Sequence, residues 1–229
     1  MPTKICVFDA YGTLFDVNAA ARGAAREPGM GAISNSWESV ARQWRTKQLQ
    51  YSWIRTILGE HEDFWKITRD SLDWALENNG LGGNSKLRDR LLALYRELAA
   101  FPEVPNVLSR LRESGKTTAI LSNGSPEMLN GAVRAAGIDP LLDAVLSVES
   151  VGAFKPHKSV YDMVGRKFDC GPEDVLFASS NGWDAASASH YGFRAVWVNR
   201  LGEPVDALPR KPNRIVSDLE EIPLIAGCS

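Results

Sequence analysis

Polar side chains follow three short apolar runs of the sequence, at the point where each run ends. Asp9 follows KICVF, Ser122 and Asn123 follow TTAIL, and the segment SSNGWD at 179–184 follows VLFA. Lys155 stands in a loop before a further helical pattern. A carboxylate can act as a nucleophile or a base, and hydroxyl, amide and ammonium groups can stabilise negative charge. One such junction is unremarkable, but three of them together with a lysine suggest one common site.

The apolar runs predict strands of a parallel sheet. After residue 100 they alternate with helical patterns. The predicted strands lie at 4–8, 117–121, 144–148, 175–178 and 195–199. Such alternation implies a parallel sheet with helices on both faces. Ligands bind beyond the carboxyl ends of the strands in such a sheet, so Asp9, Ser122-Asn123 and 179–184 are expected to meet at one edge.

The segment between the first two predicted strands is helical. Its apolar residues follow three- and four-residue steps in three stripes, and the first stripe runs from Trp37 through Ile54 to Leu58. A helical block that separates one strand from the rest of its sheet is typical of an inserted cap. The sequence therefore predicts an α/β fold: a doubly wound, Rossmann-like parallel-sheet core (1–17 and 100–229) with a helical cap subdomain (18–99).

Composition narrows the class of protein. Apolar residues make up 44% of the 229 residues, as in ordinary globular proteins, and the net charge of −2 argues against binding nucleic acid through its phosphates. No apolar run approaches the roughly 20 residues that cross a membrane, and Asp9 arrives before an export signal could form. The three cysteines show neither a disulfide framework nor metal spacing. We expect a cytoplasmic protein without a nucleic-acid or membrane partner.

Four motifs resemble those of a known superfamily. DAYGTLFD at 9–16, LSNGS at 121–125, Lys155-Pro156 and SSNGWD at 179–184 match, in order and spacing, the motifs of the haloacid dehalogenase superfamily. The segment WRTKQLQYSW at 44–53 is similar to the cap helix of the L-2-haloacid dehalogenase branch. The resemblance covers nearly the whole chain and implies hydrolysis of a carbon–halogen bond.

Position 11 departs from the magnesium-dependent phosphatases of the same superfamily. Those relatives carry a second aspartate two residues after the nucleophile, which protonates the leaving alcohol and supports the metal, whereas this chain has Tyr11. Asp184 is the only acid of the fourth motif, although magnesium prefers one or two carboxylates. A departing halide needs no proton, so we expect neither a metal nor an organic cofactor.

The resemblance implies that Asp9 displaces halide from the α-carbon of a 2-haloacid and forms an ester with it. Thr13 and Lys155 would orient Asp9, and Asn181 would assist in the same site. Water would then attack the ester carbonyl and regenerate the carboxylate. Because displacement inverts the α-carbon and hydrolysis leaves it untouched, an (S)-2-haloacid would give an (R)-2-hydroxyacid.

The same resemblance implies two anion sites. Arg45 and Asn123 would bind the departing halide, and Ser122 with the backbone amides after Asp9 would hold the substrate carboxylate. Further residues are candidates for contact with the substrate, although each could instead belong to the core or shape a loop. These are Ala10, Tyr11, Leu49, Phe64, Ser179 and Trp183.

Two residues are candidates for the base that activates water. The family pattern favours Asp184. His190 is an alternative because it lies shortly after the fourth motif and imidazole titrates near neutral pH.

The sequence therefore predicts a metal-independent (S)-2-haloacid dehalogenase, a hydrolase of short-chain haloacids that releases halide. The resemblance also implies a homodimer. One alternative is a magnesium-dependent small-molecule phosphatase of the same superfamily, which Tyr11 opposes. The other is a non-catalytic binding descendant, which is opposed by the joint presence of Asp9, Arg45, Asn123, Lys155 and Asp184.

Overall fold

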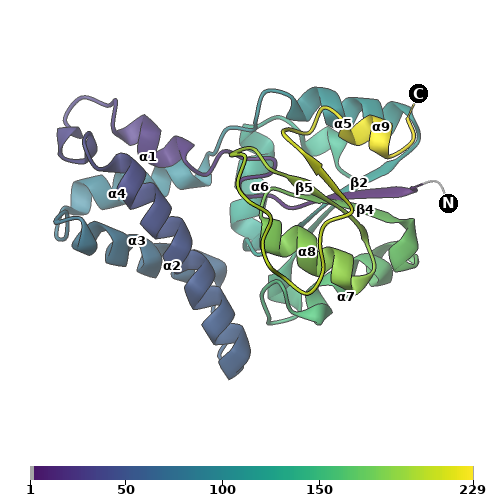
Figure 1. Cartoon of the computed structure of the whole chain (residues 1–229). Coiled ribbons are helices and arrows are strands. Elements are labelled where there is room, and N and C mark those ends of the chain that lie inside the picture. Colours follow the sequence, from purple (N-terminus) through teal and green to yellow (C-terminus); the bar gives the residue numbers. More distant parts are fainter. Residues whose placement is uncertain (1–2, 229) are drawn as a thin grey trace.

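A six-stranded parallel sheet forms the centre of the larger of two parts (Figure 1). The computed structural model describes residues 3–228. Its strands lie in the order β3-β2-β1-β4-β5-β6. They are β1 (Ile5–Phe8), β2 (Thr117–Ser122), β3 (Ala144–Ser147), β4 (Val175–Ser179), β5 (Arg194–Val198) and β6 (Arg214–Val216). The strand order reverses between β1 and β4, which are paired neighbours, and a ligand site is expected at such a point.

Helices cover both faces of this sheet. In Figure 1, α5 (Val104–Glu113) and α9 (Ile222–Ile225) lie on one face, and α7 (Lys158–Phe168) and α8 (Gly182–Tyr191) lie on the other. A further helix, α6 (Pro126–Ala135), packs against β3. Because both faces are covered, every residue of β1 and β4 is buried, which explains the continuous apolar runs in their sequences.

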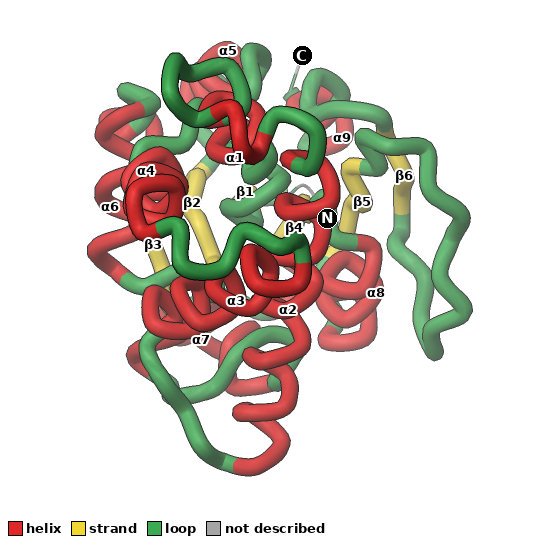
Figure 2. The backbone as a smooth tube through the Cα atoms, turned by 90° about the vertical axis from the view of Figure 1, so that its left-hand side faces the viewer, coloured by secondary structure: helices red, strands yellow, loops and turns green. Residues whose placement is uncertain are grey.

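The second part, called the cap below, consists of α1 (Ala19–Ala24), α2 (Trp37–Leu58), α3 (Phe64–Asn78) and α4 (Ser85–Arg96). Gly59, with φ 72°, ends α2 in a left-handed conformation. The Asp63 carboxylate then begins α3 by accepting hydrogen bonds from the amides of Trp65 and Lys66. In Figure 2 the cap faces the reader and lies in front of the sheet.

The predicted fold class is confirmed, and the five predicted strands correspond to β1 to β5. The sequence patterns did not indicate α8, α9 or β6. The apolar stripe that starts at Trp37 was expected to be buried along its whole length. This expectation was wrong at its end, since Ile54 is 45% and Leu58 67% exposed. The physical reason is length, because the last turns of α2 extend beyond the neighbouring helices (Figure 1).

Candidate active site

Asp9 follows β1 directly and is held by three hydrogen-bond donors. Its Oδ2 accepts from the Thr13 hydroxyl and from Asn181 Nδ2, both at 3.0 Å, and its Oδ1 accepts from Lys155 Nζ at 3.1 Å. Asp9 as a whole is 6% exposed. Buried carboxylates need such donors because burial without them is costly. The arrangement fixes the carboxylate, and within residues 3–228 it leaves Oδ1 with a single donor.

The loop after Asp9 packs closely on the loop after β4. Gly12 adopts φ +90°, and a Cβ atom there would lie 2.9 Å from the Ser180 hydroxyl. The Thr13 hydroxyl accepts a hydrogen bond from the backbone amide of Ser180 at 2.8 Å. In the same loop, the Ser179 hydroxyl accepts from the amide of Asn181 at 3.2 Å. Ser179 therefore shapes the loop that carries Asn181.

Lys155 connects Asp9 to a second buried carboxylate. Its Nζ lies 2.9 Å from Asp184 Oδ2, and Lys155 and Asp184 are 1% and 0% exposed. Tyr161 on α7 donates its hydroxyl to Asp184 Oδ1 at 2.8 Å. Sequence reasoning missed Tyr161, because its spacing with Val160 and Val164 is that of an ordinary buried helix face.

Burial and charge act in opposite directions on this cluster. Burial lowers the pKa of Lys155, but the carboxylates of Asp184 and Asp9 outweigh it and raise that pKa above its ordinary value. Burial raises the pKa of Asp184, and the Asp9 carboxylate adds to this, while Lys155 and Tyr161 oppose it. Lys155 therefore stays charged, and Asp184 accepts a proton more readily than an ordinary aspartate.

The end of β2 supplies groups that can hold anions. Asn123 Oδ1 accepts a hydrogen bond from the backbone amide of Lys155 at 2.9 Å, which fixes the side chain and leaves its amide nitrogen to donate elsewhere. The Ser122 hydroxyl accepts from the amide of Gly124 at 3.1 Å and keeps its own hydrogen to donate. Within residues 3–228, the backbone amides of Ala10 and Tyr11 have no hydrogen-bond acceptor. Ala10 and Tyr11 follow Asp9 in the chain, whereas Ser122 is the last residue of the neighbouring strand β2 and Asn123 comes directly after it.

The cap contributes a cation to the same place. Arg45 on α2 donates from Nη2 to Asn181 Oδ1 at 3.3 Å, and Asn181 in turn donates to Asp9. Arg45 Nη1 donates to Gln48 Oε1 at 2.9 Å. The structure thus brings Asp9, Asn181 and Arg45 into one chain of hydrogen bonds.

Aromatic side chains enclose this region. The Tyr11 ring stacks on Tyr95 of α4 with centroids 5.6 Å apart and lies 6.4 Å from the ring of Phe64. Trp183 of α8 meets Trp53 of α2 edge to face at 5.3 Å. Tyr11 and Phe64 are buried, and Trp183 is half-buried. A further candidate, Leu49, is half-buried on α2, one turn beyond Arg45.

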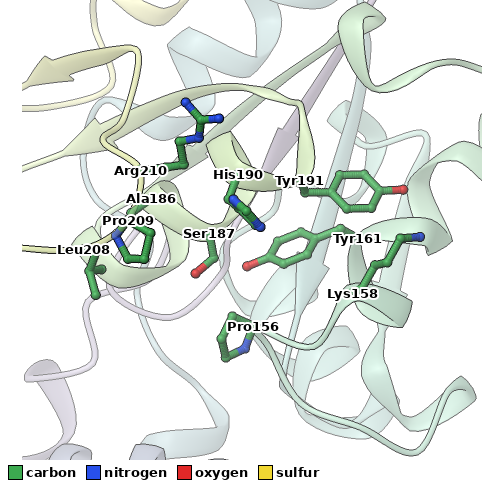
Figure 3. A pocket seen from close by; sticks show the side chains of 10 residues that line it. All are labelled: Pro156, Lys158, Tyr161, Ala186, Ser187, His190, Tyr191, Leu208, Pro209 and Arg210. Carbon is green, nitrogen blue, oxygen red and sulfur yellow. The ribbon is translucent and has the colours of Figure 1, made fainter.

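His190 lies elsewhere. It is exposed in the last turn of α8 and lines a cavity of about 400 Å³ on the outside of the core (Figure 3). Tyr161 lines the same cavity and donates its hydroxyl to Asp184. Within the described residues, no hydrogen bond links His190 to Asp9, Lys155 or Asp184.

In residues 3–228, no group of three or more His, Cys, Asp or Glu side chains is arranged to hold a metal ion. None of the described helices is long and apolar enough to span a membrane.

Comparison with known proteins identifies the family. Residues 3–192 match the family model of the haloacid dehalogenase-like hydrolases. The chain is 42% identical to (S)-2-haloacid dehalogenase 1 of Pseudomonas sp. (strain CBS-3), with 97% of this chain and 96% of that protein covered. It is 39% identical to (S)-2-haloacid dehalogenase 4A of Burkholderia cepacia, with 97% and 95% covered. The chain belongs to the haloacid dehalogenase-like hydrolases.

Within this family the chain groups with the (S)-2-haloacid dehalogenases. A solved structure of the L-2-haloacid dehalogenase from Xanthobacter autotrophicus with chloropropionic acid covalently bound superimposes with a TM-score of 0.86 at 35% identity. The superposition covers 99% of this chain and 100% of that chain. The resemblance to the L-2-haloacid dehalogenases that the sequence motifs indicated is confirmed.

Proposed function

We propose that the protein hydrolyses short-chain (S)-2-haloacids to (R)-2-hydroxyacids and halide through an ester on Asp9. The observation that carries this proposal is the geometry of Asp9. Its carboxylate is held by Thr13, Asn181 and Lys155, and Asn181 also accepts from the cap residue Arg45. The covalently bound chloropropionic acid in the Xanthobacter autotrophicus relative supports it.

In the first half-reaction, an Asp9 oxygen attacks the α-carbon, and the carbon–halogen bond breaks with its electron pair leaving on the halide. Oδ1 is the better placed oxygen, because it has one donor where Oδ2 has two. Arg45 and the amide nitrogen of Asn123 stabilise the departing halide. Attack from the side opposite the halide inverts the α-carbon.

The substrate carboxylate needs donors that the protein does not already use. The backbone amides of Ala10 and Tyr11 and the hydroxyl of Ser122 meet this requirement, since each keeps a hydrogen to donate. Tyr11, Leu49, Phe64 and Trp183 enclose the rest of the substrate. Water exclusion by these side chains strengthens the electrostatic interactions within the site.

In the second half-reaction, water attacks the ester carbonyl of Asp9. The bond between that carbonyl and the product oxygen breaks, the 2-hydroxyacid takes up a proton, and the carboxylate is regenerated with net release of one proton. Asp184 is the base, because it is linked to Asp9 through one lysine and its pKa is raised. His190 is the weaker alternative, because its side chain is exposed and, within residues 3–228, has no hydrogen bond to Asp9, Lys155 or Asp184.

Tyr11 opposes the alternative that the protein is a magnesium-dependent phosphatase. Burial, and after it the neighbouring Tyr95, raise the pKa of this phenol well above its usual value. Such a hydroxyl is a poor acid for a leaving alcohol, and Tyr11 offers no carboxylate to a magnesium ion. A halide leaving group needs neither.

The same proposal includes the division into two subdomains, the oligomeric state and the cellular location. Residues 18–99 form a cap subdomain that brings Arg45 and Phe64 to the core residues 1–17 and 100–229. The free thiols at positions 6, 170 and 228 fit the reducing cytoplasm.

The exposed apolar side chains of Ile54, Ile57 and Leu58 at the end of α2 favour a homodimer. Light scattering on the purified protein tests whether it is a dimer.

The activity is tested by the halide released from each enantiomer of 2-chloropropionate in the presence of EDTA. We expect halide from the (S) enantiomer alone, and no phosphate from p-nitrophenyl phosphate with magnesium. Asp9→Asn is the matched control, because an amide cannot form the ester. Phosphate release would favour the phosphatase, and the absence of both products would favour a binding protein.

A further inference from the structure

Gln48 is a buried polar side chain of the cap. It lies three residues after Arg45 on α2 and is 1% exposed. Its Oε1 accepts from Arg45 Nη1 at 2.9 Å, and its Nε2 donates to the Thr68 hydroxyl at 2.8 Å. An amide at this depth is costly unless both of its ends are bonded. Both ends of Gln48 are bonded, and one of them holds Arg45.

The groups that hold Gln48 are themselves fixed. The Thr68 hydroxyl donates to the backbone carbonyl of Phe64 on α3 at 2.8 Å. Gln48 Nε2 also lies 3.2 Å from the hydroxyl of Tyr95 on α4, whose ring stacks on Tyr11 of the core. Gln48 therefore connects three helices of the cap, and its orientation is set by more than one partner.

Arginine has a long side chain that loses much rotational freedom when it is ordered. Arg45 is anchored at two points, by Gln48 through Nη1 and by Asn181 through Nη2. The Gln48 anchor belongs to the cap, whereas the Asn181 anchor belongs to the core. With Asn181 alone, the guanidinium would be free to rotate away from the place where halide leaves.

We propose that Gln48 is a positioning residue for Arg45, which it holds in the orientation that stabilises the departing halide. This inference rests on the role proposed above for Arg45. Gln48 acts through the guanidinium and does not itself touch the substrate. Misplacing a catalytic group by about 1 Å can slow a reaction about 100-fold, so a missing anchor has a measurable effect.

The leaving group distinguishes positioning from general damage. Chloride leaves less readily than bromide, so its departure depends more on stabilisation by Arg45. The value of kcat/KM reports the steps up to the first irreversible one, which includes halide departure. Loss of the Gln48 anchor should therefore lower kcat/KM more for (S)-2-chloropropionate than for (S)-2-bromopropionate.

The main variant is Gln48→Met, which keeps the size of the side chain and removes its hydrogen bonds. We expect kcat/KM for the chloro substrate to fall about 10- to 100-fold, and the bromo-to-chloro ratio to rise about threefold or more. Gln48→Glu keeps an acceptor for Arg45 and should return the ratio towards that of the unaltered protein. If Gln48→Met does not fold, Thr68→Val tests the same proposal. It removes the hydroxyl that holds Gln48 Nε2 and should also raise the bromo-to-chloro ratio.

Ser71→Ala is the matched control. Ser71 is buried on α3, and its hydroxyl lies 2.6 Å from the backbone carbonyl of Ile67 and 3.1 Å from that of Thr68. Within residues 3–228 its side chain has no hydrogen bond to Arg45 or Gln48. Its loss perturbs the cap but removes no side-chain hydrogen bond of Arg45 or Gln48, so the bromo-to-chloro ratio should stay unchanged. A ratio raised equally in Ser71→Ala would reduce the Gln48 effect to cap damage and overturn the proposal.

Arg45→Ala separates this inference from the proposed function. If Arg45→Ala leaves the ratio unchanged, the halide role of Arg45 is wrong, and the Gln48 inference is wrong with it. If Arg45→Ala raises the ratio and Gln48→Met does not, only the Gln48 inference is wrong. Support requires that both raise it, and that the double variant raises it no further than Arg45→Ala alone.

Discussion

The Lys155 ammonium lies 2.9 Å from the carboxylate of Asp184, and both side chains are closed off from solvent. The same ammonium is 3.1 Å from Asp9, so the proposed nucleophile and the proposed base share one cation. Esterification of Asp9 removes one of the two negative charges that face Lys155. Asp184 then keeps the ammonium as its partner, and the loss of the Asp9 charge favours its ionised form.

Because both carboxylates face this one cation, we expect Lys155 to contribute to stability as well as to the proposed reaction. Lys155→Met leaves two buried carboxylates without a counter-charge, so we expect it to lower the free energy of unfolding by about 3–5 kcal/mol. The deficit should grow as the pH rises, because deprotonation charges the carboxylates. Urea unfolding measures both effects.

Lys158→Met is the control for that experiment. Lys158 pairs with Asp162 on the surface of α7, and its side chain is 74% exposed. Its loss should change the free energy of unfolding by less than about 1 kcal/mol. Equal effects of the two substitutions would contradict the account of the buried cluster.

Asn123→Ala tests the proposed halide site. The substitution removes the amide nitrogen assigned to the halide and the acceptor for the backbone amide of Lys155. We expect kcat for (S)-2-chloropropionate to fall about 100- to 1000-fold. Asn130→Ala, at an exposed position on α6, is the matched control and should leave the rate unchanged. A fall below tenfold in Asn123→Ala would remove Asn123 from the halide site.

Tyr161→Phe tests the environment of Asp184. The Tyr161 hydroxyl bonds to the ionised form of Asp184 and so lowers the pKa of that carboxyl, against the raising effect of burial. Without the hydroxyl, the pKa of Asp184 should rise further. Because the base must be ionised, activity should then be lost at a higher pH on acidification than in the unaltered protein.

The pH dependence of kcat, with each variant checked for folding, measures this shift. Tyr191→Phe is the control, since its hydroxyl donates to Asp162 outside the site. If kcat of Tyr161→Phe falls at the same pH on acidification as kcat of the unaltered protein, ionisation of Asp184 does not govern that fall.

Much of the sheet could be predicted because β1 and β4 are buried at every residue, and β2 and β5 at all but their first, so these strands are largely apolar. The helix α8 was missed because GWDAASASHY contains small residues and no marked apolar stripe, although its alanines pack closely on β4 and β5. Strand β6 has only three residues, of which Val216 alone is buried, so it leaves little pattern.

The candidate site was predictable where chemistry and motif position coincide, as at Asp9 and Lys155. Tyr161 and Gln48 were missed for a common reason. Each lies on a helix a few positions after a predicted site residue, and each is fixed by a partner far away in the sequence. From the sequence alone, Tyr161 resembles an ordinary core residue and Gln48 an ordinary surface amide. Only the fold shows that Tyr161 bonds to Asp184 and Gln48 to Tyr95.

The same network makes a prediction for the base. Asp184→Asn should allow the ester on Asp9 to form but slow its hydrolysis, because no carboxylate is left to take a proton from water. A burst of about one halide per active site should be followed by slow turnover. His190→Ala, which alters the outer face of α8, should turn over as the unaltered protein does.

The most direct test of the ester mechanism is the mass of the peptide that contains Asp9. Asp184→Asn is mixed with (S)-2-chloropropionate, quenched and digested. The account predicts that this peptide gains the mass of the substrate less the halide. In the double variant that carries both Asp9→Asn and Asp184→Asn, the peptide should gain no mass. A burst of halide without an adduct on Asp9 would contradict the ester mechanism, and an adduct that accumulates only in His190→Ala would transfer the role of base to the histidine.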